Sequence, residues 1–373
     1  MNNSIYMDNA ATTPLRDCAY ETMKYALYSR YQNPSSAYSG AKENKKTLES
    51  CRCQIAELIN ADPTEIYFTS GGTEADNWAL KGIKINSEDN IVTTKVEHDA
   101  VYRTAGDIEA EVRYASPDIN GRVHFEDIMK QVDDHTKLVS CMTINNETGT
   151  TMPIITLGKT LRERGIVFHT DAVQAFGHVP IDVVKMNVDM LSASAHKFGG
   201  PKGIGFLYAR HMTKLNKIIQ GGHQERDMRA GTENLPAIMG MAAAAKEAVK
   251  NMVENYSSME EISTYLIGRI ITEIDFAKYN SGMFHYPGII NFSFIGVPGE
   301  QLVEFMNQNK ICISSGSACN TDSNLPSRVL MAMGRTEDEA NCAVRFSLSE
   351  NNTMEEAARV IEVLKKGVNL IRG

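Results

Sequence analysis

The chain has 373 residues, a formal net charge of -8 and a pI near 5.7. This length allows a large buried core and fits a large domain with a smaller one better than a single unit. The acidic balance gives no general electrostatic reason to bind nucleic acid or anionic lipid, so we expect small molecules and other proteins as partners.

Two further features indicate the compartment. The first residues lack the basic region and apolar run of an export signal, and no apolar segment approaches the roughly 20 residues that cross a bilayer. The seven cysteines are odd in number and contain no Cys-x-x-Cys pair, which favours free thiols in a reducing compartment. We therefore expect a cytoplasmic protein with no contact to a membrane and no metal site.

In the first two thirds of the chain, strand-like and helix-like segments alternate. Strands are predicted at residues 65–69, 90–94, 137–142, 165–169 and 206–208, and helices lie between them, for example at 36–60 and 154–164. This alternation predicts a doubly wound α/β domain with a mainly parallel sheet and helices on both faces.

After Pro236 the pattern changes to long helices and shorter strands. Helices are predicted at 239–255, 259–277 and 354–371, and strands at 288–294, 311–314 and 343–348. We expect a large domain over residues 13–255, and a smaller α+β domain made of residues 1–12 and 256–373.

The ends of the predicted strands are the first places to search for a site, because open α/β sheets bind ligands beyond the carboxyl ends of their strands. The segment 69–74, Thr-Ser-Gly-Gly-Thr-Glu, links a strand to a helix. Its glycines allow close backbone approach, and free amides at a helix start attract a phosphate. An ordinary helix cap explains the same segment equally well.

A second candidate is Asp171, which follows the strand at 165–169. A carboxylate there can pair with a protonated ring nitrogen of a cofactor, although an Asp at a strand end is more often a helix cap. Gln174 lies one turn further on and either reaches the same ligand or faces solvent.

The third candidate is Lys197, in the run Ser-Ala-His-Lys-Phe-Gly-Gly-Pro at 194–201. A lone lysine after a strand is usually a solvated charge. Here a glycine-rich turn follows at once, and that run matches neither the dinucleotide fingerprint nor the P-loop. An amine in this setting is a candidate nucleophile for holding an aldehyde cofactor.

The fourth candidate is Cys319, in Ser-Ser-Gly-Ser-Ala-Cys at 314–319 and followed by Asn-Thr-Asp-Ser-Asn. A single cysteine is usually a small buried hydrophobe. These small and polar neighbours cannot build a core, so they favour an exposed loop. An exposed thiol is a candidate reactive group.

Together these motifs give a specific resemblance. The chain resembles the cysteine desulfurases of the NifS/IscS type, which have the class V aminotransferase fold of the fold-type I pyridoxal phosphate enzymes. The likeness covers nearly the whole length, from Tyr-Met-Asp-Asn-Ala-Ala-Thr-Thr-Pro at 6–14 to Arg-Phe-Ser-Leu at 345–348. It implies a large domain with a mainly parallel, seven-stranded sheet and a smaller α+β domain that carries the Cys319 loop.

The resemblance also implies roles for individual residues. Lys197 would hold pyridoxal 5'-phosphate covalently and move protons at the substrate's α-carbon, while Cys319 would take the sulfur. His98 would stack on the cofactor ring and act as an acid or base. The other cofactor-binding residues implied are Gly72, Thr73, Asn146, Asp171, Gln174, Ser194, His196 and, from a neighbouring subunit, Thr232.

Arg345 and Asn33 are implied to bind the substrate carboxylate. A planar guanidinium meets a carboxylate at two points, which fixes orientation. From the residues alone, a pairing of Arg345 with a structural acid is an equal alternative.

The implied reaction is removal of sulfur from L-cysteine, giving L-alanine and a persulfide on Cys319. The sulfur would pass to an acceptor protein, such as an iron-sulfur scaffold, for cluster, thio-cofactor or tRNA synthesis, and the enzyme would be a homodimer. The alternatives are a selenocysteine lyase, another class V aminotransferase or lyase, and a thiol-based sensor that has lost turnover.

Overall fold

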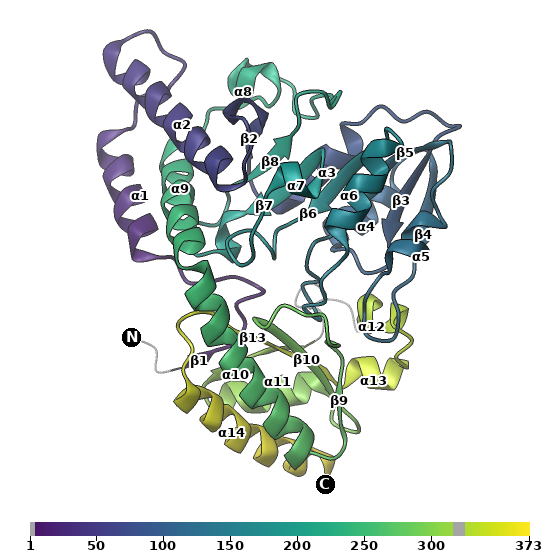
Figure 1. Cartoon of the computed structure of the whole chain (residues 1–373). Helices are drawn as coiled ribbons and strands as arrows, with labels where there is room; N and C mark the ends of the chain where they lie inside the picture. The colour runs from purple at the N-terminus through teal and green to yellow at the C-terminus, as the bar shows by residue number, and fades with distance from the viewer. Residues whose placement is uncertain (1–3, 316–324) are drawn as a thin grey trace.

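The computed structural model describes residues 4–315 and 325–373 of the chain. A seven-stranded sheet covered by helices forms the larger part, and a four-stranded and a two-stranded sheet form a smaller part below it in Figure 1. Of the helices described, none combines the length and the apolar character that crossing a membrane requires.

The large sheet has the strand order β2-β8-β7-β6-β5-β3-β4. Strand β8 runs antiparallel to both of its neighbours, and the other pairs are parallel. This confirms the predicted mainly parallel sheet. Its strands are β2 (Ile66–Thr69), β3 (Asn90–Thr94), β4 (Glu111–Ala115), β5 (Thr136–Ser140), β6 (Val167–Asp171), β7 (Met190–Ser194) and β8 (Gly205–Ala209).

Alternate residues of the central strands point to opposite faces of this sheet, as the period of a strand requires. Ile91 packs with the apolar side of α3 (Gly72–Lys81) and α4 (Asp99–Gly106), whereas Val92 belongs to the cluster that also contains α2, α6 and α9. The sheet is therefore covered on both faces. The remaining helices of this part are α1 (Asp17–Ser29), α2 (Ser39–Leu58), α5 (Phe125–Met129), α6 (Ile154–Glu163), α7 (Val183–Met186), α8 (Gln224–Asp227) and α9 (Leu235–Lys250).

The smaller part is built on the antiparallel order β12-β13-β10-β9, with the parallel pair β1-β11 beside it. Its strands are β1 (Ile5–Tyr6), β9 (Ala277–Tyr279), β10 (Ile289–Phe294), β11 (Ile311–Cys312), β12 (Ser314–Ser315) and β13 (Ala343–Ser347). Its helices are α10 (Met252–Glu273), α11 (Gly299–Gln308), α12 (Arg328–Ala332), α13 (Glu337–Asn341) and α14 (Met354–Arg372).

The amino-terminal segment connects the two parts. The Asn9 backbone N–H donates to the Ser347 carbonyl at 3.2 Å, and the Thr13 N–H donates to the His196 carbonyl at 2.9 Å. Within five residues the chain therefore passes from strand β13 of the smaller part to the turn that carries Lys197.

The predicted boundaries of the two long helices are wrong. Helix α9 begins at Leu235, four residues before the predicted start, and α10 begins at Met252. The Asn234 side chain accepts a hydrogen bond from the Ala237 N–H, so the helix starts beside Pro236. Asn251 ends α9 and precedes α10, so the break between the two helices lies there and not at the predicted residues 256–258.

A buried ion pair fixes the edge strand β2. Both oxygens of Glu225 accept from the Arg52 guanidinium at 2.7 and 2.8 Å, and the Phe68 N–H donates to Glu225 at 2.8 Å. Arg52 also donates to the Ile66 carbonyl at 2.8 Å. The pair thus holds the strand that leads into the turn at residues 69–74.

We expect Glu225→Ala to lower the free energy of unfolding by about 3–5 kcal/mol, because it leaves the Arg52 charge buried without its main partner. Urea denaturation measures this loss. The matched control is Glu49→Ala. Glu49 also pairs with Arg52, but its own side chain is 49% exposed, so this variant should lower the free energy of unfolding by less than about 1 kcal/mol. Equal losses in the two variants would contradict the prediction.

Candidate active site

A cavity of about 600 Å³ lies at the carboxyl edge of the large sheet. It receives the turn after β2, the ends of β6 and β7, the start of α4, residues from the amino-terminal segment and Arg345 of β13. It brings together ten of the predicted site residues: Gly72, Thr73, His98, Asn146, Asp171, Gln174, Ser194, His196, Lys197 and Arg345.

The turn between β2 and α3 forms one wall. Gly71 has a φ of 154°, in a region that favours glycine, and a Cβ on Gly72 would lie 2.6 Å from a methyl group of Val173. No side chain caps the start of α3, so its first amides keep hydrogen-bonding capacity for a ligand. The Ser194 hydroxyl lies on the same side, 3.5 Å from the position of a Cβ on Gly71.

His196 lies next to this wall. Burial, together with the charges of Lys197 and Lys202, lowers the pKa of its imidazole to about 4. The ring is therefore neutral at pH 7, and its Nδ1 lies 3.2 Å from the Thr12 hydroxyl. A neutral imidazole with one N–H can donate to an anion without adding a charge to the cavity.

Asp171 is the last residue of β6 and is 4% exposed. Its Oδ1 accepts from the Val173 N–H at 2.8 Å. Burial raises the pKa of this carboxyl, and the neighbouring His98 and Lys197 offset only part of that rise, because a buried charge is costly in a low-dielectric site. Gln174 lies close by and donates to the Ala10 carbonyl at 2.9 Å.

Lys197 ends the short 3-10 helix Ala195–Lys197 that follows β7. Its Nζ donates to the carbonyl oxygens of Ala10 and Ala11 at 2.6 and 2.8 Å. The amine is half-buried and lines the cavity. Lys197 therefore lines the same cavity as the glycine turn and Asp171.

His98 caps the start of α4, and its Nδ1 accepts from the Ala100 N–H at 3.1 Å. The neutral ring therefore carries its proton on Nε2. Asn146 also lines the cavity, and its backbone carbonyl is held by the Arg345 guanidinium at 2.8 Å.

Arg345 is 2% exposed and donates from Nη2 to the Asp8 carboxylate at 2.8 Å. The structural acid that the sequence left as an alternative is therefore present, 337 positions away in the chain. The Nε of Arg345 is buried and has no partner among the described residues. The guanidinium thus retains an N–H for a further acceptor.

Charged residues that the sequence analysis did not single out also line the cavity, among them Glu97, Asp76, Glu147 and Arg328. Burial raises the pKa of Glu97 to about 8 and that of Glu147 to about 6. Burial and then the charge of Asp171 raise the pKa of Asp76. The positions of Glu97 directly before His98 and of Glu147 directly after Asn146 are signals that the sequence offered.

Three predicted residues are not in this cavity. Asn33 and Thr232 are exposed on the surface of the chain. The Asn33 side chain accepts from the Ser35 N–H at 2.9 Å within its own turn. Cys319 lies outside the described residues.

Comparison with known proteins assigns the family. Residues 5–360 match the model of the family "Aminotransferase class-V". A cysteine desulfurase IscS of Clostridium botulinum is 44% identical over 98% of this chain and 94% of its own length. The chain therefore belongs to the aminotransferase class-V family.

Solved structures agree with this assignment. A structure titled as a NifS-like protein superposes with a TM-score of 0.89 at 34% identity, covering 98% of this chain and 99% of its own. A second, titled "SspA in complex with cysteine", has a TM-score of 0.83 at 34% identity and covers 94% of this chain and all of its own. The fold-type I assignment is thereby confirmed.

The family uses pyridoxal 5'-phosphate, and the cavity residues fit this cofactor. The uncapped start of α3 suits a phosphate. The buried carboxyl of Asp171, whose pKa is raised by burial, suits a cationic ring nitrogen. An amine lies between them, at Lys197. In the described part of the chain, no group of three or more His, Cys, Asp or Glu side chains is placed to hold a metal ion.

The buried carboxyl of Glu97 predicts a pH dependence of stability. Its pKa rises from the ordinary 4.5 to about 8 on folding, so the stability that it contributes is complete below pH 4.5 and is lost as the pH rises through 8. Glu97→Gln keeps the neutral form. In the cofactor-free protein, its stability relative to the wild type should increase between pH 5 and pH 8.5, by on the order of a few kcal/mol.

Thermal melts across this pH range measure the difference. The control is Glu88→Gln, which changes an exposed glutamate to the same amide and should follow the wild type at every pH. A constant difference between Glu97→Gln and the wild type from pH 5 to pH 8.5 would refute the assignment of a neutral, buried acid.

Proposed function

We propose that this protein is a pyridoxal-phosphate-dependent cysteine desulfurase, which converts L-cysteine to L-alanine and transfers the sulfur to Cys319. One observation carries the proposal: a single cavity contains the Lys197 amine, the uncapped glycine turn, buried Asp171 and the Arg345 guanidinium. The relatives named as cysteine desulfurases and the neighbour solved with cysteine support the choice of substrate.

The cofactor's phosphate is assigned to Gly72, Thr73, Ser194 and His196, and its ring nitrogen to Asp171. When bound, the cofactor supplies an electron sink that makes the α-carbon proton of the substrate acidic and weakens the bond between the β-carbon and sulfur. Gln174 would donate to its phenolic oxygen. His98 would stack on the ring, and Asn146 would lie beside the cofactor.

Arg345 binds the substrate carboxylate. Its Nη atoms already contact the Asn146 carbonyl and Asp8, which hold the planar fork in one orientation. The Nε–H and the second protons of the Nη atoms remain for the substrate. Asp8 lowers the net positive charge around Arg345, so the guanidinium orients the substrate carboxylate without binding it too tightly. Asn33 assists.

Lys197 moves the proton. The Ala10 and Ala11 carbonyls hold its Nζ at the cavity wall, within the space that the substrate's α-carbon enters. From there the amine removes the α-proton and returns it at a neighbouring carbon. The half-buried position excludes part of the solvent that would compete for this proton.

Cys319 takes the sulfur. Its thiolate attacks the substrate sulfur, so that an S–S bond forms while the C–S bond breaks. The electron pair of the broken bond stays with the β-carbon, which is protonated and becomes the methyl group of alanine. The persulfide on Cys319 then passes its outer sulfur to an acceptor protein, such as an iron-sulfur scaffold.

We expect Cys319→Ser to bind the cofactor normally but to form alanine from cysteine at least about 100-fold more slowly, because the sulfur has no acceptor. Alanine formation and the visible absorbance of the bound cofactor measure the two effects. The matched control is Cys53→Ser, since Cys53 is an exposed free thiol, and this variant should keep wild-type turnover.

Lys197→Ala tests the other half of the mechanism. It should lose both alanine formation and the absorbance of the lysine-bound cofactor. Retention of that absorbance would overturn the assignment of Lys197, and full alanine formation by Cys319→Ser would overturn that of Cys319 and favour a selenocysteine-lyase-like reaction.

We also propose that the active enzyme is a homodimer. A patch of exposed apolar side chains lies on α1 and on the loop to α2, around Asn33. These residues, the tyrosine patch, are Tyr20, Tyr25, Leu27, Tyr28, Tyr31 and Tyr38, each more than half exposed. A patch of this kind is typical of an interface. In the dimer, Thr232 reaches the cofactor phosphate of the other subunit.

Subunit mixing tests the shared site. Lys197→Ala lacks the amine in both of its sites, and Thr232→Asp places a negative charge beside both phosphates. We expect each variant alone to be inactive, and a refolded mixture to regain activity, because one site of each mixed dimer has Lys197 of one chain and Thr232 of the other. Lack of recovery in mixed dimers confirmed by sedimentation would contradict the shared site.

For the compartment we propose the cytoplasm. The six cysteines that the structure describes are all free, as expected in a reducing environment. The identity of the sulfur acceptor follows from the proposed chemistry only as a class: a protein that presents a thiol or a nascent cluster to an exposed persulfide.

A further inference from the structure

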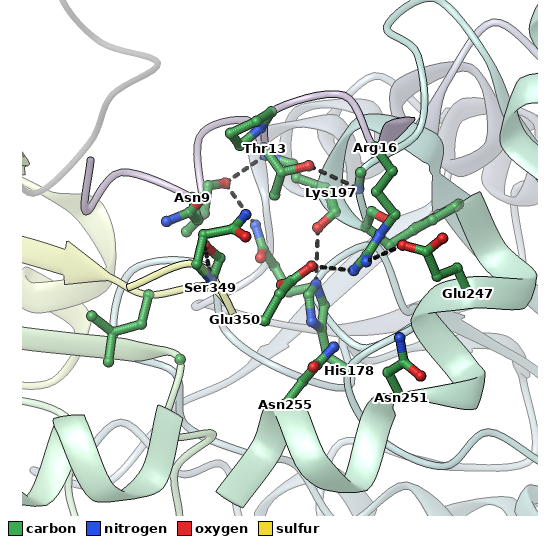
Figure 2. A pocket seen from close by; sticks show the side chains of 18 of the residues that line it. Asn9, Thr13, Arg16, His178, Lys197, Glu247, Asn251, Asn255, Ser349 and Glu350 are labelled. Carbon is green, nitrogen blue, oxygen red and sulfur yellow. Dashed lines mark hydrogen bonds and ion pairs between the residues drawn. The ribbon is translucent and has the colours of Figure 1, made fainter. Parts of the chain in front are cut away.

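A second cavity, of about 470 Å³, lies on the other side of Lys197. It shares Ala10, Gln174 and Lys197 with the cofactor cavity and extends toward the start of α10 and the residues after β13. Figure 2 shows that polar side chains from both parts of the molecule gather in it, among them His178 and Glu350. The reaction proposed above uses neither His178 nor Glu350.

His178 contacts the main chain of the cofactor-binding lysine. Its Nε2 lies 2.9 Å from the Lys197 carbonyl oxygen. A carbonyl oxygen only accepts hydrogen bonds, so Nε2 carries the proton. Burial lowers the pKa of this imidazole, so the ring is neutral near pH 7 and its Nδ1 is an acceptor.

Tyr286 supplies the donor for that acceptor. Its hydroxyl lies 3.1 Å from Nδ1 of His178, and also 3.3 Å from the sulfur of Met259. A phenol has one proton, and an imidazole nitrogen is a stronger acceptor than a thioether. The hydrogen therefore points to His178, and the direction of the chain is fixed: Tyr286 donates to His178, which donates to Lys197.

Tyr286 is itself held in place. It is 4% exposed, and its N–H donates to the Gly149 carbonyl at 2.8 Å. A Cβ on Gly288 would lie 2.3 Å from its ring, so only glycine fits there. Tyr286 lies just before β10 in the smaller part, whereas His178 belongs to the larger part. The two hydrogen bonds thus connect the lysine's peptide group to the smaller part.

One guanidinium and two carboxylates lie near this pair. Arg16 lies 3.0 Å from Glu247 and 2.5 Å from Glu350, and these three side chains line the same cavity (Figure 2). Both carboxylates already pair with Arg16, and burial lowers the pKa of His178 despite the charge of Glu350, so the imidazole stays neutral. The preceding carbonyl, of His196, is held separately by the Thr13 N–H at 2.9 Å.

We propose that His178 and Tyr286 are positioning residues for the proposed reaction: they hold the peptide carbonyl of Lys197 from behind the cofactor cavity and so fix the direction of its amine. The inference rests on the proposed function, since it takes Lys197 as the cofactor-binding lysine. A lysine side chain is long and flexible, so its reactive nitrogen is placed only as well as its main chain and its contacts allow.

The test compares four variants of the holoenzyme. Tyr286→Phe removes one hydroxyl, and His178→Ala removes both hydrogen bonds. His178→Gln keeps a donor and an acceptor on one side chain. The control is Tyr256→Phe, because the Tyr256 ring packs 6.2 Å from that of Tyr286 but its hydroxyl makes no hydrogen bond to this pair among the described contacts.

The readouts are kcat and KM for cysteine, the rate of cofactor loss on dilution, and the pH midpoint of the bound cofactor's visible absorbance. For His178→Ala and Tyr286→Phe we expect about tenfold lower kcat with KM within about twofold, and about tenfold faster cofactor loss. The pH midpoint should shift in the same two variants. His178→Gln should recover to within about threefold of the wild type, and Tyr256→Phe should match it.

Wild-type kcat, cofactor retention and pH midpoint in both His178→Ala and Tyr286→Phe would overturn the inference. So would equal losses in His178→Gln and His178→Ala, because the role then would not be hydrogen bonding to Lys197. Failure of the proposed function looks different: the wild type itself would bind no cofactor through Lys197 or form no alanine.

Discussion

The site depends on one structural constraint, the position of the amino-terminal segment between the two parts of the molecule. Asp8 and Asn9 bond to residues of β13, and three or four positions later Ala11 and Thr13 bond to the segment that carries Lys197. In the proposed reaction Arg345 binds the substrate carboxylate and Lys197 acts at the α-carbon. The two side chains are therefore set relative to each other by one short segment, which turns at residues 9–11. A local shift of the amino-terminal segment therefore changes its contacts to Arg345 and to Lys197 together.

Three buried carboxyl groups are a second constraint on the site. Asp171, Asp76 and Glu97 all lie at one edge of the sheet, and burial raises the pKa of each. Ionisation of all three at such close quarters is unfavourable unless a cation lies beside them. A protonated pyridine nitrogen next to Asp171 relieves part of that cost, so binding of the cofactor and the charge state of the cavity are linked.

Much of this arrangement was predictable because parallel strands bring their carboxyl ends to one edge. The glycine turn at 71–72, Asp171 and the turn with Lys197 each follow a strand, and sequence alone located them. The pairing of Arg345 with Asp8 and the contacts of His178 with Tyr286 join residues more than 100 positions apart, and no local pattern encodes such contacts. The break between the two long helices was predicted, but at residues 256–258 in place of Asn251, because apolar periodicity locates a helix end only to within a few residues. The buried state of Glu97 was missed because charge suggested exposure.

The position of the amino-terminal segment has a consequence for biosynthesis. Asn9 finds its partner Ser347 only 338 positions later, so a growing polypeptide on the ribosome lacks one wall of the cavity until almost all of it has been translated. Contacts of such high sequence separation form late and slowly. A nascent chain therefore lacks a complete pyridoxal phosphate pocket during elongation, and the cofactor binds only after synthesis of the chain is finished.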